Sequence, residues 1–180
     1  MARVFVALGV PDDVRDALMD LQTGLRPARW VDADNFHLTL TFIGEVDRRG
    51  AEDLASALAD VDAPPFKIEL VGCGYFGDKR PHAVWAAVAP NPALDLLQMK
   101  TETAARRAGL EPDRRRFTPH VTLAYLSGAA RGEVEAWRAE RGLFRARPVS
   151  VDAFHLYRSH LGRGGARYEI LETFEISPLG

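Results

Sequence analysis

The sequence predicts an internally duplicated α/β fold, and three observations support that prediction. Apolar runs rich in Val, Phe and Leu alternate with segments whose apolar residues recur at helical spacing. The order of these elements in the first half is nearly repeated in the second. The corresponding strands, 37–43 and 120–126, both begin with the string His-h-Thr-h, where h is apolar. Because no low-complexity linker separates the halves, we expect two lobes of one domain over residues 1–180.

Local signals place the elements of the first half. Proline and acidic residues favour the first turn of a helix, and Pro11, Asp12 and Asp13 supply them after the first strand. A proline pair at 64–65 ends the second helix. In order, we expect a strand over 3–9, a helix from Pro11 with apolar residues through Leu25, a strand over 37–43 closed by Gly44, a helix over about 48–59, and strands over about 66–75 and 83–89.

The second half has the same kinds of signal. Gly109 follows a run of helical periodicity and marks its end, because glycine is the usual residue just past a helix. Near the end of the chain, the glycine-rich stretch 159–165 predicts a turn between two strands. In order, we expect a helix over about 92–108, a charged loop over 111–116, a strand over 120–126, a helix over about 131–141, and strands over 149–157 and 166–176.

Composition excludes several classes of protein. Hydrophobic residues make up 47% and charged residues 27% of the chain, as in ordinary globular proteins, and the net charge is -2. The only cysteine is Cys73, so a disulfide scaffold is excluded. No apolar run approaches the roughly 20 residues that span a bilayer, and the N-terminus lacks a signal peptide's apolar stretch and cleavage site. We therefore expect a cytoplasmic protein without a membrane contact.

Strand geometry gives the two His-h-Thr-h strings a chemical meaning. Side chains alternate faces along a strand, so His37 and Thr39 share one face with Thr41 and Ile43, and Phe42 lies on the other. The same alternation places His120 and Thr122 on one face, opposite Val121, Leu123 and Tyr125. If a two-fold axis relates the lobes, two imidazoles and two hydroxyls converge on one cleft.

Such a set suits the cleavage of a phosphate ester. A neutral imidazole takes a proton and an imidazolium gives one, while two hydroxyls donate hydrogen bonds to the phosphate oxygens between them. His37 and His120 are then the candidate acid–base pair, with Thr39 and Thr122 as phosphate ligands. No metal is needed if the imidazoles perform both proton transfers.

Two other interpretations of the strings remain open. Each histidine can simply begin a strand, and each threonine is a good strand former. A two-histidine metal site is the chemical alternative, but it lacks an obvious third ligand, since Glu45 lies beyond Gly44. His82, His155 and His160 have no matched partner, and we expect structural or solvent roles for them.

At these residues the chain resembles a known family. Segments 29–46 (RWVDADNFHLTLTFIGEV) and 115–126 (RRFTPHVTLAYL) resemble the paired signatures of the 2H phosphoesterases. They are most similar to the RNA 2′,3′-cyclic phosphodiesterase family, also called the LigT or 2′-5′ RNA ligase-like family. Segments 3–14, 72–88 and 154–171 are similar to family segments in the same order, so the resemblance covers nearly the whole chain.

The resemblance implies a bilobal α/β (α+β) fold, in which two antiparallel-rich sheets flanked by helices surround a central cleft. It implies metal-independent hydrolysis of RNA 2′,3′-cyclic phosphate ends to 2′-phosphomonoesters, without a cofactor. His37 would be the proton donor and His120 the proton acceptor. The implied partner is RNA with a cyclic phosphate end, including tRNA fragments, or a small cyclic nucleotide, and we expect a monomer. A 2′-5′ RNA ligase, or an RNA-end binding module with little turnover, is the alternative function.

The chain departs from the family at one position. Many members carry an arginine five residues after the second histidine, where this chain has Tyr125. Tyrosine brings no positive charge, so we expect Arg115, Arg116 or Arg158 to contact the substrate instead. Phe42 and Tyr125 hold mirror positions and can serve either as core residues or as a base-stacking platform beside the cleft.

Overall fold

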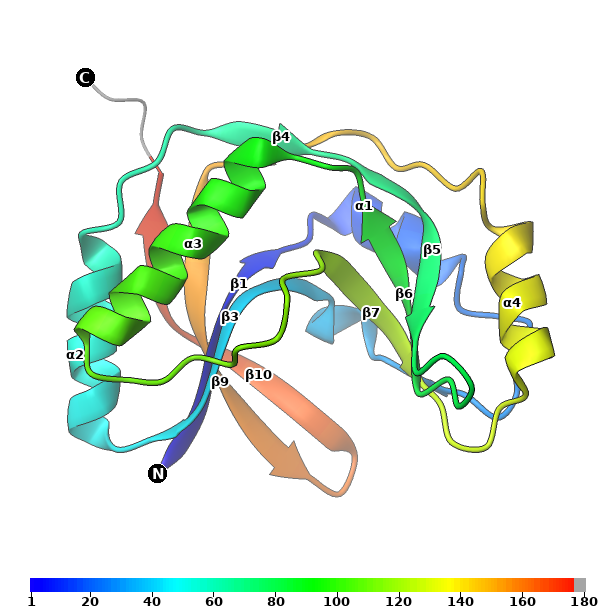
Figure 1. Cartoon of the computed structure of the whole chain (residues 1–180), viewed down its shortest axis with the longest axis horizontal. Coiled ribbons are helices and arrows are strands. Elements are labelled where there is room, and N and C mark those ends of the chain that lie inside the picture. The colour runs from blue at the N-terminus through cyan, green and yellow to red at the C-terminus, as the bar shows by residue number, and fades with distance from the viewer. Residues whose placement is uncertain (177–180) are drawn as a thin grey trace.

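A computed structural model describes residues 1–176, in which ten strands and four helices form two lobes around a central pair of strands (Figure 1). The strands are β1 (Ala2–Gly9), β2 (Arg29–Trp30), β3 (His37–Val46), β4 (Phe66–Ile68), β5 (Leu70–Phe76), β6 (Ala83–Val88), β7 (His120–Tyr125), β8 (Val149–Val151), β9 (Ala153–Gly162) and β10 (Gly165–Glu175). The helices are α1 (Asp12–Met19), α2 (Arg48–Ala59), α3 (Pro92–Arg107) and α4 (Arg131–Glu140), with a 3₁₀ turn at Ala33–Asn35.

The helices begin and end where local chemistry favours it. Asp47 caps α2 by accepting a hydrogen bond from the backbone N–H of Gly50 at 2.7 Å. Asn91 caps α3 in the same way, with Pro92 in its first turn and Gly109 just past its end at a φ of +80°. None of the helices within residues 1–176 is long and apolar enough to cross a bilayer.

The predicted fold class is confirmed, and the sheet adds how the lobes are joined. Within residues 1–176 the paired strands all run antiparallel, and eight strands form one sheet with the path β10-β9-β1-β3-β7-β6-β5, to which β2 adds by pairing with β7. A separate two-stranded sheet joins β4 to β8. The two predicted sheets therefore meet at the β3–β7 contact, where a lobe built on β3 adjoins a lobe built on β7.

Each lobe contains strands from both halves of the sequence. Strands β9 and β10 come from the C-terminal half but extend the sheet beyond β1, on the β3 side. Strand β5 comes from the N-terminal half but pairs with β6, on the β7 side. In Figure 1, α2 and α3 lie beside the β3 lobe, and α4 lies beside β5 at the opposite end. The lobes are thus interlocked rather than consecutive.

Equivalent residues of the two halves pair with each other across the centre. Strands β3 and β7 pair at Leu38 opposite Val121, and β4 pairs with β8 around Lys67 opposite Ser150. The partners in each pair are 83 positions apart, which is also the separation of His37 and His120. Antiparallel pairing of equivalent residues requires a local two-fold axis between them. This axis relates the two motif histidines, which precede the paired residues Leu38 and Val121 at the β3–β7 junction.

A β-bulge at the same place in each lobe corrects the predicted faces of the two strands. Opposite β3, the register advances from Ala7–Thr39 to Val6–Thr41, and opposite β7 it advances from Trp85–Thr122 to Val84–Ala124. One extra residue on β3 and on β7 breaks the alternation of side chains.

The bulge reverses the faces of the residues that follow it. Thr41, expected beside His37, is buried with 4% of its surface exposed, and Ala124 is fully buried. Phe42 and Tyr125, expected on the opposite face, lie on the side of the histidines instead.

Several predicted ends of strands and helices differ from the structure. Strand β3 was expected to end before Gly44 but continues to Val46, and Gly44 adopts a φ of +96° within it. Helix α1 ends at Met19. Leu21 and Leu25, which were expected in the helix, belong to the loop that follows it, and their side chains are buried. The predicted turn over 159–165 is shorter than expected, since β9 runs to Gly162 and β10 begins at Gly165.

A close contact between β5 and β6 fixes an aromatic ring near the centre of the β7 lobe. Gly74 lies opposite Trp85, and a Cβ atom added to Gly74 would lie 2.3 Å from the indole ring. We therefore expect Gly74→Ala to lower the free energy of unfolding by about 1–3 kcal/mol, the usual cost of overpacking. Denaturant unfolding of the purified protein measures this change.

The matched control is a glycine with open space around it. Gly132 lies in α4, and a Cβ added there meets no atom within 4 Å. Gly132→Ala is expected to raise stability by about 0.4–1 kcal/mol, because alanine has less backbone entropy to lose. Equal effects of the two substitutions would contradict the proposed packing constraint at Gly74.

Candidate active site

The two lobes enclose a cleft of about 580 Å³ at the β3–β7 junction. The cleft brings together all four residues of the two His-h-Thr-h strings. Its wall is completed by the segment before β7 and by residues of β6 and α3. The lining residues are His37, Thr39, Leu40, Thr41, Phe42, Phe76, His82, Ala83, Gln98, Asp113, Arg115, Arg116, Phe117, Thr118, His120, Thr122 and Tyr125.

Both motif histidines are anchored through the same ring nitrogen. The Nδ1 of His37 lies 2.7 Å from the carbonyl oxygen of Asn35, and the Nδ1 of His120 lies 2.5 Å from that of Thr118. A carbonyl only accepts, so each Nδ1 carries the proton of the neutral ring. Each Nε2 is therefore left with a lone pair that can accept a proton. The two-fold axis thus relates the hydrogen bonds of the histidines as well as their positions.

Aromatic rings pack against each imidazole and lower its pKa. The His37 ring centroid is 4.9 Å from those of Phe5 and Tyr168. The His120 centroid is 4.9 Å from that of Phe76 and 5.5 Å from that of Trp85. Burial among these rings disfavours the charged form and lowers the pKa of both histidines.

The two imidazoles also act on each other. After burial, the charge of His120 is a further cause that lowers the pKa of His37, while the hydrogen bond to Asn35 opposes the shift. Two protonated imidazoles in one cleft repel, whereas an anion between them favours a proton on one. A cleft that holds a phosphate is therefore suited to one neutral and one protonated histidine, which are a base and an acid.

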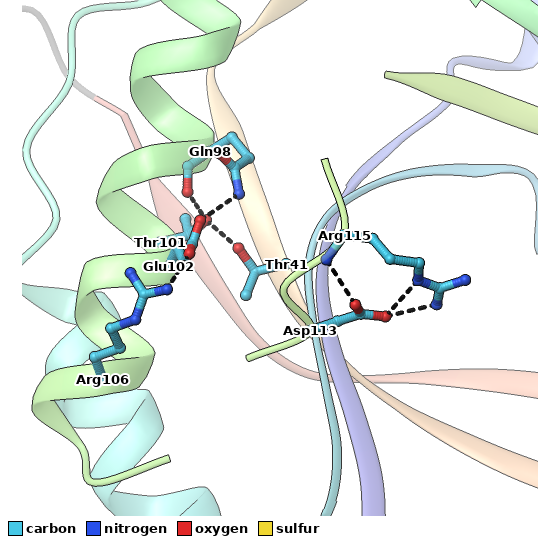
Figure 2. Close-up of polar contacts among 7 residues, drawn as sticks. All are labelled: Thr41, Gln98, Thr101, Glu102, Arg106, Asp113 and Arg115. Carbon is cyan, nitrogen blue, oxygen red and sulfur yellow. Dashed lines mark hydrogen bonds and ion pairs between the residues drawn. The ribbon is translucent and has the colours of Figure 1, made fainter. Parts of the chain in front are cut away.

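The three threonines of this region have different surroundings. Thr39 and Thr122 line the cleft on the same strands as the histidines. The Thr41 hydroxyl lies beyond the bulge, and its Oγ1 is 2.9 Å from that of Thr101 on α3. Figure 2 shows this contact continuing along α3, where the Thr101 hydroxyl donates to the carbonyl of Gln98. Thr41 thus ties β3 to α3, leaving Thr39 and Thr122 as the hydroxyls suited to a phosphate.

The arginines before β7 line the cleft but differ in their charge balance. Arg115 donates to Asp113 through Nε at 2.8 Å and through its backbone N–H at 2.9 Å (Figure 2). The Arg115 guanidinium holds the pKa of the Asp113 carboxyl below its usual range. Arg116 lines the same cleft, and no carboxylate within residues 1–176 forms an ion pair with it. The positive charge of Arg116 is therefore not offset by a carboxylate, as that of Arg115 is, and is the more available of the two to an anion.

Arg158 is not among the cleft-lining residues, which corrects its predicted role. Alternation along β9 directs Tyr157 toward Phe5 and His37, so Arg158 faces the other side of the sheet. There it lines a separate groove with residues of α2, including Arg48 and Glu52.

Sequence reasoning did not assign His82, which lines the cleft, or Arg29, which lies against the cleft residue Tyr125. His82 lines the wall near Phe76, with ring centroids 6.3 Å apart. Arg29, on the two-residue strand β2, pairs with Tyr125 and places its Cζ 5.4 Å from the centroid of the tyrosine ring. Tyr125 is 45% exposed, so the core interpretation of this residue was wrong. A strand as short as β2 has too little periodicity to be detected from sequence.

Within residues 1–176, no set of three or more His, Cys, Asp or Glu side chains is placed to hold a metal ion.

Comparison with known proteins identifies relatives along the whole chain. The family model described as LigT like Phosphoesterase matches residues 8–85 and 87–168, and each segment contains one His-h-Thr-h string. The chain is 35% identical to the RNA 2′,3′-cyclic phosphodiesterase of Aeropyrum pernix over 171 residues, 93% of this chain and 95% of the relative. It is 34% identical to the enzyme of the same name from Thermus thermophilus, over 97% of this chain and 90% of the relative.

Solved structures give the same result. The crystal structure of Escherichia coli LigT complexed with 3′-AMP matches with a TM-score of 0.79 and 26% identity, covering 98% of this chain and 99% of that one. A crystal structure of a Thermus thermophilus protein matches with a TM-score of 0.75 and 30% identity, covering 97% of each chain.

The anchoring of the histidines predicts their state in the free protein. In histidine NMR spectra, we expect the neutral rings of His37 and His120 to carry the proton on Nδ1. Because burial disfavours the charged form, both rings should titrate below the ordinary pKa of 6.5 and stay neutral at pH 7. His37→Gln and His120→Gln assign the signals. A neutral ring protonated on Nε2, or a titration above pH 6.5 in the absence of phosphate, would contradict the geometry.

Proposed function

The chain belongs to the LigT-like phosphoesterase family, and from that premise we propose that it hydrolyses 2′,3′-cyclic phosphate ends of RNA to 2′-phosphomonoesters without a metal ion. One observation carries the proposal. Two imidazoles anchored through Nδ1, His37 and His120, line a single cleft together with the hydroxyls of Thr39 and Thr122. Relatives named RNA 2′,3′-cyclic phosphodiesterase support the choice of substrate.

The reaction requires two proton transfers, and each histidine performs one. A water oxygen forms a bond to phosphorus while the bond from phosphorus to the ribose O3′ breaks. The Nε2 of His120 takes a proton from the water, and the Nε2 of protonated His37 gives a proton to O3′. The phosphate remains on O2′, and the proton then returns from His120 to His37 through solvent.

The surroundings of the two histidines support this division of labour. Burial keeps both rings neutral in the free protein, and their mutual repulsion opposes double protonation. The negative charge of a bound cyclic phosphate favours one protonated ring. The bound ribose decides the direction, because the imidazole that faces O3′ acts as the acid. The family resemblance assigns that position to His37.

The phosphate and the terminal base have separate ligands in the cleft. The Thr39 and Thr122 hydroxyls donate to the non-bridging oxygens, where negative charge increases in the transition state. Arg116 provides positive charge, and Arg115 positions the segment before β7 through its ion pair with Asp113. Phe42 offers a ring face at the cleft for stacking of the terminal base.

The direct test is product analysis in the presence of EDTA. An RNA with a 2′,3′-cyclic phosphate end is incubated with the purified protein, and the products are separated against 2′- and 3′-phosphate standards. We expect only the 2′-phosphate. His37→Ala and His120→Ala should each lower turnover by about a hundredfold or more, the usual contribution of a general acid or base.

A histidine outside the cleft provides the control. His160 bonds Glu169 through Nε2 at 2.6 Å on the β9–β10 hairpin, and His160→Ala should retain full turnover. Thermal unfolding verifies that each variant is folded. A 3′-phosphate product would place the acid at O2′ and contradict the proposal, as would loss of turnover with EDTA. RNA that binds without product would indicate a binding module instead.

A further inference from the structure

Arginines and aromatic rings gather at the mouth of the cleft, next to His37. The Cζ of Arg3, on β1, lies 5.0 Å from the ring centroid of Phe42. The Cζ of Arg29, on β2, lies 5.4 Å from that of Tyr125. Phe42 and Tyr125 are equivalent positions after the two bulges, so each lobe presents one arginine on one ring. We call Arg3, Arg29, Tyr125 and Tyr168 the mouth cluster.

Tyr168 of β10 connects the cluster to the candidate acid. Its ring meets that of His37 edge-on, with centroids 4.9 Å apart. Burial raises the pKa of the Tyr168 phenol, Tyr125 raises it further, and the charges of Arg29 and Arg3 lower it. All three side chains are therefore close enough to act on the phenol. Through the contact of Tyr168 with His37, the cluster adjoins the part of the cleft where the phosphate would react.

The charges of the cluster are available to a ligand. Within residues 1–176, neither Arg3 nor Arg29 has a carboxylate oxygen within ion-pair distance. Arg115 and Arg147 differ, since they are neutralised by Asp113 and Asp13. Arg3 and Arg29 are exposed, and Tyr125 is 45% exposed. An arginine lying on a ring still directs its N–H groups outward, where they can donate to phosphate oxygens.

We propose that the mouth cluster binds the RNA segment on the 5′ side of the cyclic phosphate, with bases stacked on Tyr125 and Tyr168 and backbone phosphates bound by Arg29 and Arg3. This inference rests on the proposed function, because an RNA with a cyclic 3′ end continues only on its 5′ side. Aromatic faces combined with cations are the usual means of binding single strands. The substrate is thus an oligoribonucleotide end, which binds more tightly than a mononucleotide.

Binding of product-type RNAs tests the inference without requiring turnover. The dissociation constants of RNAs with a terminal 2′-phosphate and one, two or four nucleotides are measured by competition. We expect the tetranucleotide to bind at least tenfold more tightly than the mononucleotide, since each stacked base contributes several-fold. Its affinity should also fall more steeply with salt, by a slope of about 0.7 for each additional phosphate contact.

Substitutions in the cluster identify its residues. Arg29→Gln and Tyr125→Leu should each remove most of the tenfold length advantage, and Tyr125→Phe should retain it. The control is Arg48→Gln, which removes another exposed arginine charge, paired with Glu52 on α2, and should leave the length advantage intact. Thermal unfolding verifies that the variants are folded.

The outcomes separate the two proposals. Equal affinity for one and four nucleotides, or a full length advantage in Arg29→Gln, overturns the role of the cluster. If that protein still forms 2′-phosphate ends, the proposed function survives. A length advantage that depends on Arg29, in a protein without turnover, supports the cluster and overturns the proposed function alone.

Discussion

The pairing of β3 with β7 is the constraint on which the rest of the site depends. These strands meet at Leu38 opposite Val121, the residues that follow His37 and His120. Because equivalent residues pair, the contact generates a two-fold axis and brings the histidines from opposite lobes into one cleft. Pairing of β4 with β8 has the same 83-residue offset and reinforces this axis from a second position. A shift of register at either place would separate the imidazoles.

The symmetry of the frame explains how two like residues can perform opposite steps. Each imidazole is held by a carbonyl two residues earlier, so both Nε2 atoms are free to accept or give a proton. The asymmetry comes from the substrate, which presents water on one side of phosphorus and a leaving oxygen on the other. The β-bulges after Thr39 and Thr122 are also repeated in both lobes. They turn the equivalent residues Phe42 and Tyr125 toward the cleft instead of the core.

The sequence predicted the parts of the site that depend on local pattern. The two strings identified His37, Thr39, His120 and Thr122, and the duplication indicated that they would meet. The lobes interlock because β1 pairs with β9, more than 100 residues later in the chain. The spacing of apolar residues along the sequence does not show which distant strands pair. The bulges depend on the register of the adjacent strand, so the face of Tyr125 was predicted wrongly. Arg29 was missed because β2 has only two residues.

The central claim, one acid and one base in a symmetric pair, is tested most directly by replacing the leaving oxygen. In a cyclic phosphate with sulfur in place of O3′, the thiolate leaves without a proton, because a thiol has a pKa of about 8.5. We expect His37→Ala to hydrolyse the sulfur compound within about tenfold of the unsubstituted protein, while His120→Ala remains about a hundredfold slower on both compounds. If His120→Ala, and not His37→Ala, regained activity on the sulfur compound, His120 would be the acid and His37 the base. Equal losses in both variants with both compounds would contradict the acid–base pair.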